Sequence, residues 1–510
     1  MADPEQMEFL RQGAEAWNEW RRRTSDVVCD LSKADLKGQD LSGCDLSGAK
    51  LVGADLTGAN LSSAQLVDAH MGQVVMTDAQ LTGTNAQRVR LTAVNAEGAH
   101  MRGADLTGAD ITRGNLSRVD FRDANLAGAQ LPMTNLAQSN LEGAQLPVAN
   151  LEGAVLSAAR LDGASLHGAN LSRAHLPMVS MRGGDLTRAD LAESNFWKAD
   201  LLDAVMTGAN LERSSLAGAN LRNANMALAQ LAYADLTGAC LAGADMQRVR
   251  LSHAALTDAD CSKSNLTGAR LDSAELVRTN FGGAHLVGCD LAGALLVHAV
   301  LEDAELTDCW LNEIVIAAPR DEGSRQGNLS LTPSDEAQLM VDDLRSAEFI
   351  APLITRSEWP DLFDVGGSRM VLVVGCYPEP RRSELDAIRA SLRSRSYFPV
   401  VVDVAKPVGS KLRGVFENLI RMCCFGILDL SDRGLYPELS YFQQALAALP
   451  VQPIVAEHVE GERLDEASLH FMRKAYRYRD SDTLADEFDE VVASVHKVVP
   501  RSVSGASTMN

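Results

Sequence analysis

The sequence predicts a mixed architecture: a long all-β coil of square cross-section, followed by a small α/β domain. Three observations lead to it. A leucine or another apolar residue recurs at every fifth position from Leu31 to Leu311 with no change of register. A small residue, most often alanine, stands two positions before most of them. Beyond residue 368 this period is absent, and apolar runs typical of strands alternate with amphipathic stretches typical of helices.

The five-residue period excludes the two regular elements. In an α-helix five residues turn the side chain by roughly 500°, so successive leucines would spread around the whole helix. In a straight strand an odd spacing places consecutive leucines on opposite faces. A chain that turns a corner after every pentapeptide keeps all of them inside, because each pentapeptide becomes one wall of a square coil. Four such walls complete a coil of 20 residues, and the glycines, aspartates and asparagines of the repeat suit its corners.

The residue before each apolar centre is often aspartate or asparagine, as in Asp55, Asn60 and Asp105. With the small residue ahead of it, this gives the pattern A(D/N)LXX, which resembles the consensus of the pentapeptide-repeat protein family. The resemblance covers 31–311, over half of the chain. It implies a right-handed quadrilateral β-helix, which we expect at 29–315.

The two ends of the repeat are expected to be protected by other structure, because open coil ends expose unpaired strands. Residues 1–28 are predicted to form an N-terminal helical cap. Its helix is expected at 7–23, where Leu10, Ala14 and Trp17 form an apolar stripe. After the repeat we expect a linker and a helix over 316–367.

Within that segment, the residues at 318–332 are polar and contain glycine and serine, which predicts the linker. The helix is expected at 333–354, with Thr332 or Ser334 as its N-cap. The last residues, 501–510, are predicted to be a disordered tail.

Residues 368–500 are predicted to form a flavodoxin-like α/β domain, because alternating strands and helices favour a parallel sheet. The expected strands are 370–375, 398–404, 425–430 and 451–456. The expected helices are 382–395, 411–423, 437–448 and 483–498. In such sheets ligands bind at the carboxyl ends of the strands.

Composition limits the classes of partner. The net charge of -21 argues against direct binding of nucleic acid and against docking on anionic membranes. No apolar run approaches the roughly 20 residues that span a bilayer, and no signal peptide is evident at the first residues. The nine cysteines have no CxxC spacing. We therefore expect a reduced, cytoplasmic protein with a protein partner, and self-association stays open.

Polar residues follow the first three expected strands, where a ligand site would lie. The candidate ligand-binding residues are Gly375, Tyr377, Asp403, Asp429, Ser431 and Asp432. The chain has no GxGxxG or GxxxxGK[ST] loop that could cradle phosphates. It also has no HExxH motif or paired cysteine and histidine set that could hold a metal. The sequence thus predicts no metal and no cofactor.

The run at 425–439 resembles the third strand and following helix of TIR-type and nucleoside deoxyribosyltransferase-type domains. In those families a glutamate at this helix start serves glycosidic cleavage of NAD or nucleosides. The resemblance implies that Glu438 is the catalytic carboxylate, acting on an oxocarbenium-like centre. It also implies that Asp403 and Asp429 hold ribose hydroxyls of NAD. The chain lacks the aromatic Ser-Tyr opening after the first strand and the Trp-Cys pair ahead of the glutamate, which puts this activity in doubt.

The segments at 341–350 and 370–454 also resemble a C-terminal domain that recurs in bacterial pentapeptide-repeat proteins and has no secure activity. Overall organisation favours a non-catalytic protein-interaction scaffold. Its repeat rod would bind a protein partner and its C-terminal domain would act in recognition or signalling. Two alternatives stay open: an NAD or nucleotide glycosidase that uses Glu438, and a DNA-mimic inhibitor of a topoisomerase. Arginines that interrupt any anionic face disfavour the mimic; they are Arg88, Arg90, Arg248 and Arg250.

Overall fold

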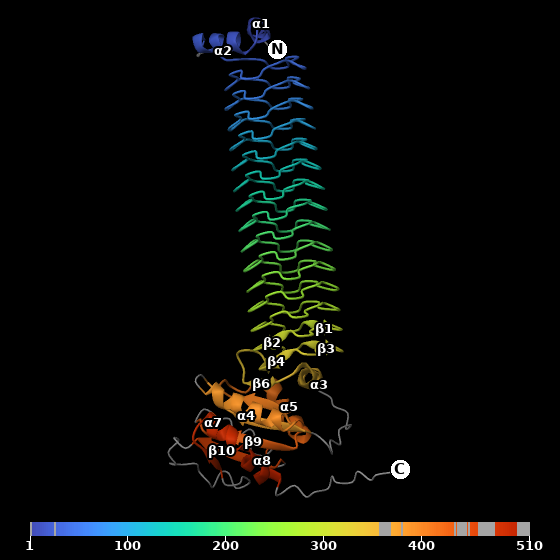
Figure 1. Cartoon of the computed structure of the whole chain (residues 1–510), viewed down its shortest axis with the longest axis vertical. Helices are drawn as coiled ribbons and strands as arrows, with labels where there is room; N and C mark the ends of the chain where they lie inside the picture. Colours follow the sequence, from blue (N-terminus) through green and yellow to red (C-terminus); the bar gives the residue numbers. More distant parts are fainter. Residues whose placement is uncertain are drawn as a thin grey trace, which may run out of the picture. The chain divides into compact units, whose positions relative to one another are not determined.

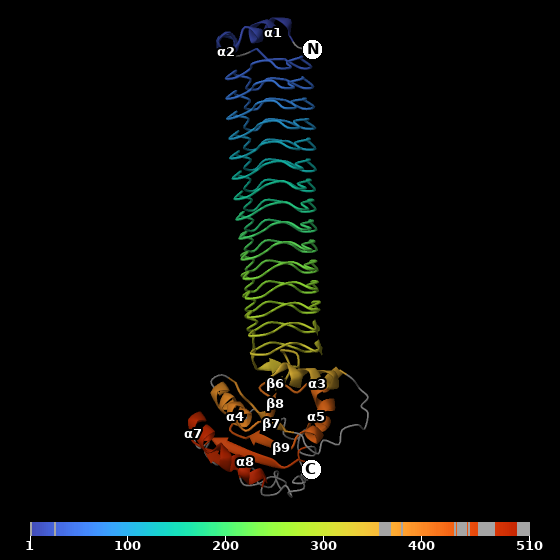
Figure 2. The same ribbon diagram turned by 45° about the vertical axis from the view of Figure 1, so that its right-hand side comes forward.

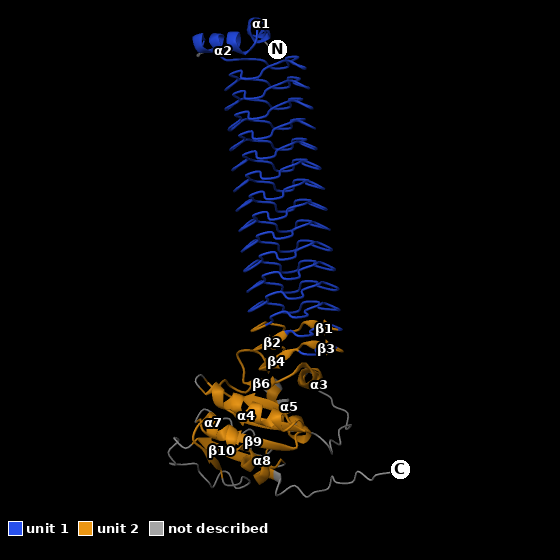
Figure 3. Cartoon of the chain, in the orientation of Figure 1, with its two compact units in different colours: residues 1–286, 298–304, 319–323 blue, residues 287–297, 305–318, 324–510 orange. Residues whose placement is uncertain are grey.

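The chain, represented by a computed structural model, divides into two compact units (Figure 3). The described residues are 3–24, 27–355, 369–378, 381–432, 435, 446, 449–456 and 475–496. The first unit comprises residues 1–286, 298–304 and 319–323, and the second comprises residues 287–297, 305–318 and 324–510. Glu438, most of the helix expected at 437–448 and the tail at 501–510 lie outside the described residues.

The first unit is a stack of square coils (Figure 1). The residue before each apolar centre forms a parallel bridge with the residue 20 positions later, as in Asp30↔Lys50 and Asp260↔Asn280. The backbone N–H of each centre also donates to the coil that follows, as from Leu31 to the Lys50 oxygen over 2.7 Å. Because 20 residues separate stacked partners, four pentapeptides form one coil. The expected β-helix of pentapeptide walls is confirmed.

The interior of these coils is filled by the apolar centre and the small residue of each pentapeptide. The large centres Phe121, Phe196 and Phe281 are fully buried, as is the small residue Ala59. Their regular burial explains why the sequence keeps its register, since a shifted residue would bring a polar side chain into the tube.

The aspartate or asparagine before each centre has a local role at the corner. The carboxylate of Asp55 accepts a hydrogen bond from the backbone N–H of Thr57 over 3.1 Å. This contact stabilises a turn in which the next residue, Gly58, has a φ of 64°. The left-handed conformation at that corner is the reason glycine is so frequent there.

Two helices lie at the N-terminus instead of the single one expected at 7–23. They are α1 (Pro4–Arg11) and α2 (Ala14–Arg23). Gly13, between them, has a φ of 99°, which only glycine adopts readily, so the helix is interrupted there. Asp3 caps α1 by accepting a hydrogen bond from the backbone N–H of Glu5 over 2.9 Å.

The second unit begins with coil segments of its own, and these continue into the stretch where a linker was expected. The strand β1 (Leu295–Val297) pairs in parallel with β3 (Val315–Ala317), and β2 (Glu305–Thr307) pairs with β4 (Arg325–Gly327). The linker expected at 318–332 is therefore wrong for β4 and the residues after it. The apolar signal is lost there because Gln326 occupies a centre position, where its side chain accepts a hydrogen bond from the backbone N–H of Leu344 over 2.6 Å.

A strand and a shorter helix replace the helix expected at 333–354. Strand β6 (Gln338–Val341) pairs antiparallel with β5 (Leu329–Ser330) and with β8 (Phe398–Asp403), and α3 (Leu344–Thr355) follows it. Thr332 caps no helix: its hydroxyl accepts a hydrogen bond from the backbone N–H of Leu339 over 3.0 Å. The spacing of Leu339, Val341 and Leu344 suits a helix, but pairing with β8 decides the conformation.

A seven-stranded sheet forms the centre of the second unit, with strand order β11-β10-β9-β7-β8-β6-β5. Its other strands are β7 (Met370–Gly375), β8 (Phe398–Asp403), β9 (Phe425–Asp429), β10 (Val451–Ala456) and β11 (Tyr476–Tyr478). These five are parallel to one another, and β6 and β5 run antiparallel at one side. The sheet is thus mixed, and its strands β11, β6 and β5 were not predicted.

Helices cover both faces of this sheet (Figure 2). They are α4 (Arg382–Ser394), α5 (Ser410–Met422), α7 (Ser481–Asp486) and α8 (Phe488–His496). On one face, α4, α7 and α8 bury Ile388, Leu484 and Phe488 against Val373 and Ile427. The helix expected at 483–498 is divided at Glu487, where α7 ends.

Candidate functional site

Three neighbouring strands bring most of the candidate residues to one edge of the sheet. Gly375 ends β7 and is paired in register with Asp403, which ends β8. On the other side of β7, Asp429 ends β9, and Ser431 follows it. The expected clustering at the carboxyl ends of the strands is therefore present among the described residues. Glu438 lies outside them.

Asp429 is engaged by an ion pair inside the protein. It is fully buried, and its carboxylate lies 2.8 Å from Nη2 of Arg381. The Ser431 hydroxyl donates to the same carboxylate over 2.6 Å. Arg381 is itself fixed, because it also donates to the Cys376 backbone oxygen over 3.1 Å and pairs with Glu384 over 2.7 Å. Burial alone would lower the pKa of Arg381, but Asp429 and Glu384 outweigh it and raise the pKa, so the guanidinium stays charged.

Tyr478 completes this network from β11, the strand at the edge of the sheet. Its hydroxyl lies 3.2 Å from the Ser431 hydroxyl and 3.4 Å from Nη2 of Arg381. The Ser431 hydroxyl also accepts a hydrogen bond from the backbone N–H of Ala456 over 2.8 Å. Burial, and then the charge of Asp429, raise the pKa of Tyr478, so its phenol stays protonated. Asp429, Ser431, Arg381 and Tyr478 thus join β7, β9, β10 and β11.

Asp403 and Tyr377 organise the end of the neighbouring strand. One carboxylate oxygen of Asp403 accepts hydrogen bonds from the backbone N–H groups of Tyr377, over 3.1 Å, and Ala405, over 3.0 Å. The Tyr377 ring lies so close to Gly375 that a Cβ there would be 2.6 Å from the ring. Gly375 is needed for this packing. The Tyr377 hydroxyl is buried, and it has no hydrogen-bond partner among the described residues.

Asp432 lies beside the thiol of Cys376. Burial, and then the negative charge of Asp432, raise the pKa of this thiol to about 12. A thiol with this pKa is almost entirely protonated at neutral pH, so Cys376 is not an activated nucleophile.

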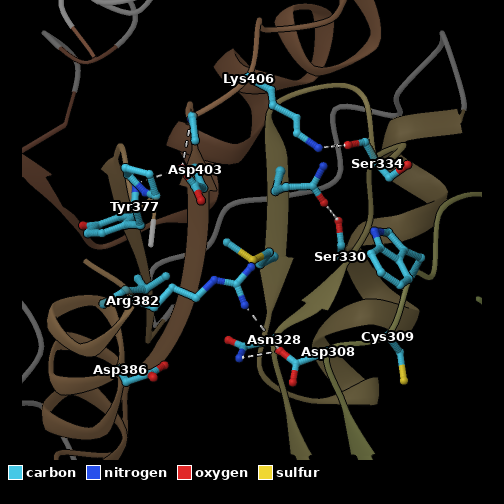
Figure 4. Close-up of a pocket in the computed structure, with 16 residues that line it drawn as sticks. Asp308, Cys309, Asn328, Ser330, Ser334, Tyr377, Arg382, Asp386, Asp403 and Lys406 are labelled. Atoms are coloured by element: carbon cyan, nitrogen blue, oxygen red, sulfur yellow. Dashed lines mark hydrogen bonds and ion pairs between the residues drawn. The ribbon is translucent and has the colours of Figure 1, made fainter. Parts of the chain in front are cut away.

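A cavity of about 320 Å³ opens beside Asp403, inside the second unit (Figure 4). Its walls come from the start of α4, the ends of β7 and β8, β6, and the coil segment of this unit. The polar residues that line it are Asp308, Asn328, Ser330, Ser334, Gln338, Tyr377, Arg382, Asp386, Asp403 and Lys406. Apart from Tyr377 and Asp403, these residues were not predicted as site residues.

Charged groups of both signs face this cavity. Arg382 extends toward Asp308, and its Nη1 lies 3.8 Å from the Asp308 carboxylate (Figure 4). Lys406 donates to the backbone oxygen of Ser334, and Asp386 lies one helical turn beyond Arg382 on α4. The sequence signal for Arg382, Asp386 and Lys406 was that they fall within the 370–454 segment, which resembles the recurrent C-terminal domain.

The described residues hold no group of three or more histidine, cysteine, aspartate or glutamate side chains arranged to bind a metal ion. Among the helices that the structure describes, none combines the length and apolar character needed to cross a bilayer.

Comparisons with known proteins identify the repeat. The family model for pentapeptide repeats matches residues 29–147 and 149–312 in overlapping segments, which is more than half of the chain. The chain is similar to HetL from the cyanobacterium Nostoc sp. strain PCC 7120, with 26% identity over 47% of this chain and 90% of that one, and a TM-score of 0.18.

Two further structures show the same kind of similarity. QnrB1, a plasmid-mediated fluoroquinolone resistance protein, is 20% identical over 36% of this chain and 88% of its own, with a TM-score of 0.22. Rfr23 from Cyanothece 51142 is 28% identical over 21% of this chain and 62% of its own, with a TM-score of 0.11. No curated protein matches the chain. The family match ends at residue 312 and leaves the α/β domain unassigned, and through its repeat the chain belongs to the pentapeptide repeat family.

Proposed function

We propose that the protein is a non-catalytic interaction scaffold, in which the coil binds a protein partner and the α/β domain recognises a polar group. One observation carries the proposal. The carboxylates at the sheet edge are already engaged within the protein, Asp429 by Arg381 and Ser431 and Asp403 by two backbone N–H groups. A polar cavity adjoins them.

The strand order supports a recognition site at this edge. When the five parallel strands are numbered along the chain, their order across the sheet is second, first, third, fourth, fifth. This is the order of flavodoxin-like sheets, which bind ligands between the ends of the first and third strands. In this chain Arg381 and Asp429 fill that position. In our proposal the ligand binds instead in the neighbouring cavity, which is lined by Arg382, Lys406 and Asp386. These charges suit a polar group with both donors and acceptors.

The recognition role can be tested with the full chain as bait. We expect wild-type protein to capture a partner that Lys406→Glu loses, because the substitution reverses a charge at the cavity. Lys263→Glu, at an exposed lysine on the coil, is the matched control and should capture the same partner as wild type. Capture of the same proteins by the Lys406 variant, or of nothing beyond bare beads, would refute the proposal.

The glycosidase alternative makes a different prediction. In it, Glu438 acts on NAD or a nucleotide, while Asp403 and Asp429 hold ribose hydroxyls. The ion pair of Asp429 with Arg381 weighs against this, because a ribose would have to replace a buried charged partner. We expect purified wild-type protein to consume neither NAD nor nucleotides. Turnover that Glu438→Ala abolishes would overturn the scaffold proposal.

The DNA-mimic alternative is weakened by ion pairs along the coil. Acidic side chains on its surface are paired with arginines of neighbouring coils, as in Asp68 with Arg88 and Asp200 with Arg182. Such pairs neutralise the charge that a mimic of the phosphate backbone would have to present. Inhibition of topoisomerase supercoiling by purified protein would restore this alternative.

A further inference from the structure

We propose that one wall of the coil in the first unit is a self-association surface, on which two copies of this chain pack antiparallel. We call it the Trp197 wall. Its inward residues recur every 20 positions from Leu36 and include Leu176, Phe196 and Leu216. Its outward residues are the one before and the two after each of these. The inference does not depend on the role of the α/β domain.

The middle of the Trp197 wall is almost free of charge. From Asn135 to Gly218, Lys198 is the one charged residue at its outward positions. Over the same coils, the adjoining wall carries Glu142, Arg160, Asp162, Arg182, Asp200, Asp203 and Arg222. Two copies of a chain with a net charge of -21 repel each other, so a neutral wall is where they approach at least cost.

Two large apolar side chains are exposed at the centre of this wall. Trp197 is 42% exposed and Met178 is 54% exposed. They lie on adjacent coils, since the backbone N–H of Met178 donates to the Trp197 oxygen over 2.8 Å. The Lys198 ammonium covers only one side of the indole, 4.5 Å from the ring centroid. Tryptophan is the residue type most enriched where interfaces gain their binding energy, and methionine adapts its shape to a partner.

The order of the charges at the two ends of the wall selects the antiparallel arrangement. Consider a two-fold axis that crosses the wall between the coils of Met178 and Lys198. Met178 of each copy then faces Lys198 of the other copy. Arg118 lies 60 residues before Met178, and Asp258 lies 60 residues after Lys198, so these two face each other across the axis.

The same symmetry aligns further polar residues toward the ends of the wall. Asp78 is 100 residues before Met178, and it faces His298, which is 100 residues after Lys198. Four coils from the axis, Glu97 and Arg278 come level. The other acidic residues of this region, Asp235 and Glu275, face the neutral Asn135 and Asn95. Within one chain, Glu97 pairs with Arg118 and Asp258 pairs with Arg278. The antiparallel contact therefore joins two ion pairs into a group of four alternating charges at each end, while no lysine meets a lysine at the centre.

The size of the wall predicts a weak, concentration-dependent dimer. Its contact region from residue 75 to residue 298 spans about twelve coils, on the order of 60 Å at about 4.8 Å per coil, and the wall is roughly 10 Å wide. Each copy would bury roughly 600 Å². The total of roughly 1,200 Å² is at the lower limit for a specific interface.

The oligomeric state of the full chain tests the proposal. Sedimentation velocity should show the 54.7 kDa monomer at low concentration and a dimer as the concentration rises to about 100 µM. Trp197→Glu should weaken dimerisation by roughly tenfold or more. Leu228→Glu is the matched control: Leu228 is 51% exposed, lies at a corner that does not border the Trp197 wall, and should behave as wild type.

A charge exchange tests the register. Arg118→Glu and Asp258→Arg should each weaken the dimer, and the combined variant should restore it, because the exchanged charges again face each other. Each single variant also breaks an ion pair within its own chain, so thermal unfolding is measured alongside to confirm that the coil is intact. A wild type that stays monomeric, a dimer that survives Trp197→Glu, or a combined variant that fails to recover would each overturn the proposal.

Discussion

The side chain of Asn18 accepts a hydrogen bond from the backbone N–H of Asp45 over 2.7 Å. Its amide also donates to the backbone oxygen of Gly43 over 2.9 Å, so one side chain makes both bonds that a preceding coil would supply. Trp17 and Arg21 of the same helix donate to the backbone oxygens of Asp45 and Ser47. Helix α2 therefore closes the first open edge of the coil through side chains.

Removal of this contact should destabilise the N-terminal end of the coil. In Asn18→Ala, the Asp45 N–H and the Gly43 oxygen lose their partners, and we expect the free energy of unfolding to fall by about 1–3 kcal/mol. Chemical denaturation followed by circular dichroism measures it. Glu15→Ala, at an exposed position on the same helix, is the control and should change stability by less than about 0.5 kcal/mol. Equal stability of the two variants would show that α2 does not close the edge.

The coil could be predicted from the sequence because each of its rules is local. An inward residue recurs at every fifth position without interruption, and an Asx residue such as Asp55 often precedes it. The end of the coil was misread, because Gln326 occupies an inward position and uses its side chain to bind the Leu344 N–H. The sequence alone does not show that a polar residue at this position is satisfied by a hydrogen bond to a residue 18 positions away.

The candidate site could be predicted only in part, for a similar reason. Strand ends identified Asp403 and Asp429 as neighbours, since parallel strands bring their carboxyl ends together. Whether these carboxylates are free depends on Arg381 and on Tyr478, and no spacing in the sequence relates Tyr478 to Asp429. The cavity was missed because its walls combine the α/β domain with the 308–330 coil segment.

Gly375 should not tolerate a side chain. In Gly375→Ala the new Cβ would lie 2.6 Å from the Tyr377 ring, so the ring or the strand must move. Such overpacking typically costs about 1–3 kcal/mol. Urea denaturation of the full chain, monitored by a signal from the α/β domain, measures this loss in the free energy of unfolding.

A double variant separates this clash from other effects of the substitution. Tyr377→Leu removes the ring, so Gly375→Ala should cost much less in that background than in wild type. Equal costs in both backgrounds would mean that the ring is not what excludes a side chain at position 375.

The coil should lose stability in acid. The Arg122 side chain and its backbone N–H hold the pKa of Asp120 below its usual value, and hydrogen bonds with Thr57 do the same for Asp55. A carboxylate whose pKa is lowered by folding stabilises the fold above its unfolded pKa of about 3.9, and this stability is lost as pH falls through the lower folded value. We expect the midpoint of thermal unfolding to be flat above about pH 5 and to fall below about pH 4.

Replacement of one such carboxylate tests the cause of that fall. Asp120→Asn should lower stability at neutral pH and reduce the loss on acidification, because the neutral amide has no proton to take up. Glu152→Gln, at an exposed carboxylate on the coil, is the control. If Asp120→Asn leaves the pH dependence as steep as in wild type, hydrogen bonding of Asp120 does not contribute to it.

One carboxylate, Asp342, holds two arginines of α4 in the second unit. It lies 3.3 Å from Nε of Arg389, which is 2% exposed, and 2.7 Å from Nη2 of Arg393, which is half-exposed. Burial lowers the pKa of Arg389 more than Asp342 raises it. The Nη1 and Nη2 atoms of Arg389 have no hydrogen-bond partner among the described residues, so this guanidinium is poorly compensated.

The two sides of this pair should therefore respond in opposite ways. Asp342→Ala leaves Arg389 buried without a counter-charge and should destabilise the α/β domain by about 3–5 kcal/mol. Arg389→Met removes the poorly compensated charge, and Asp342 keeps Arg393, so stability should be unchanged or rise. Urea denaturation of both variants against wild type measures the difference. A large loss in Arg389→Met would mean that the guanidinium makes contacts worth more than the cost of burying it.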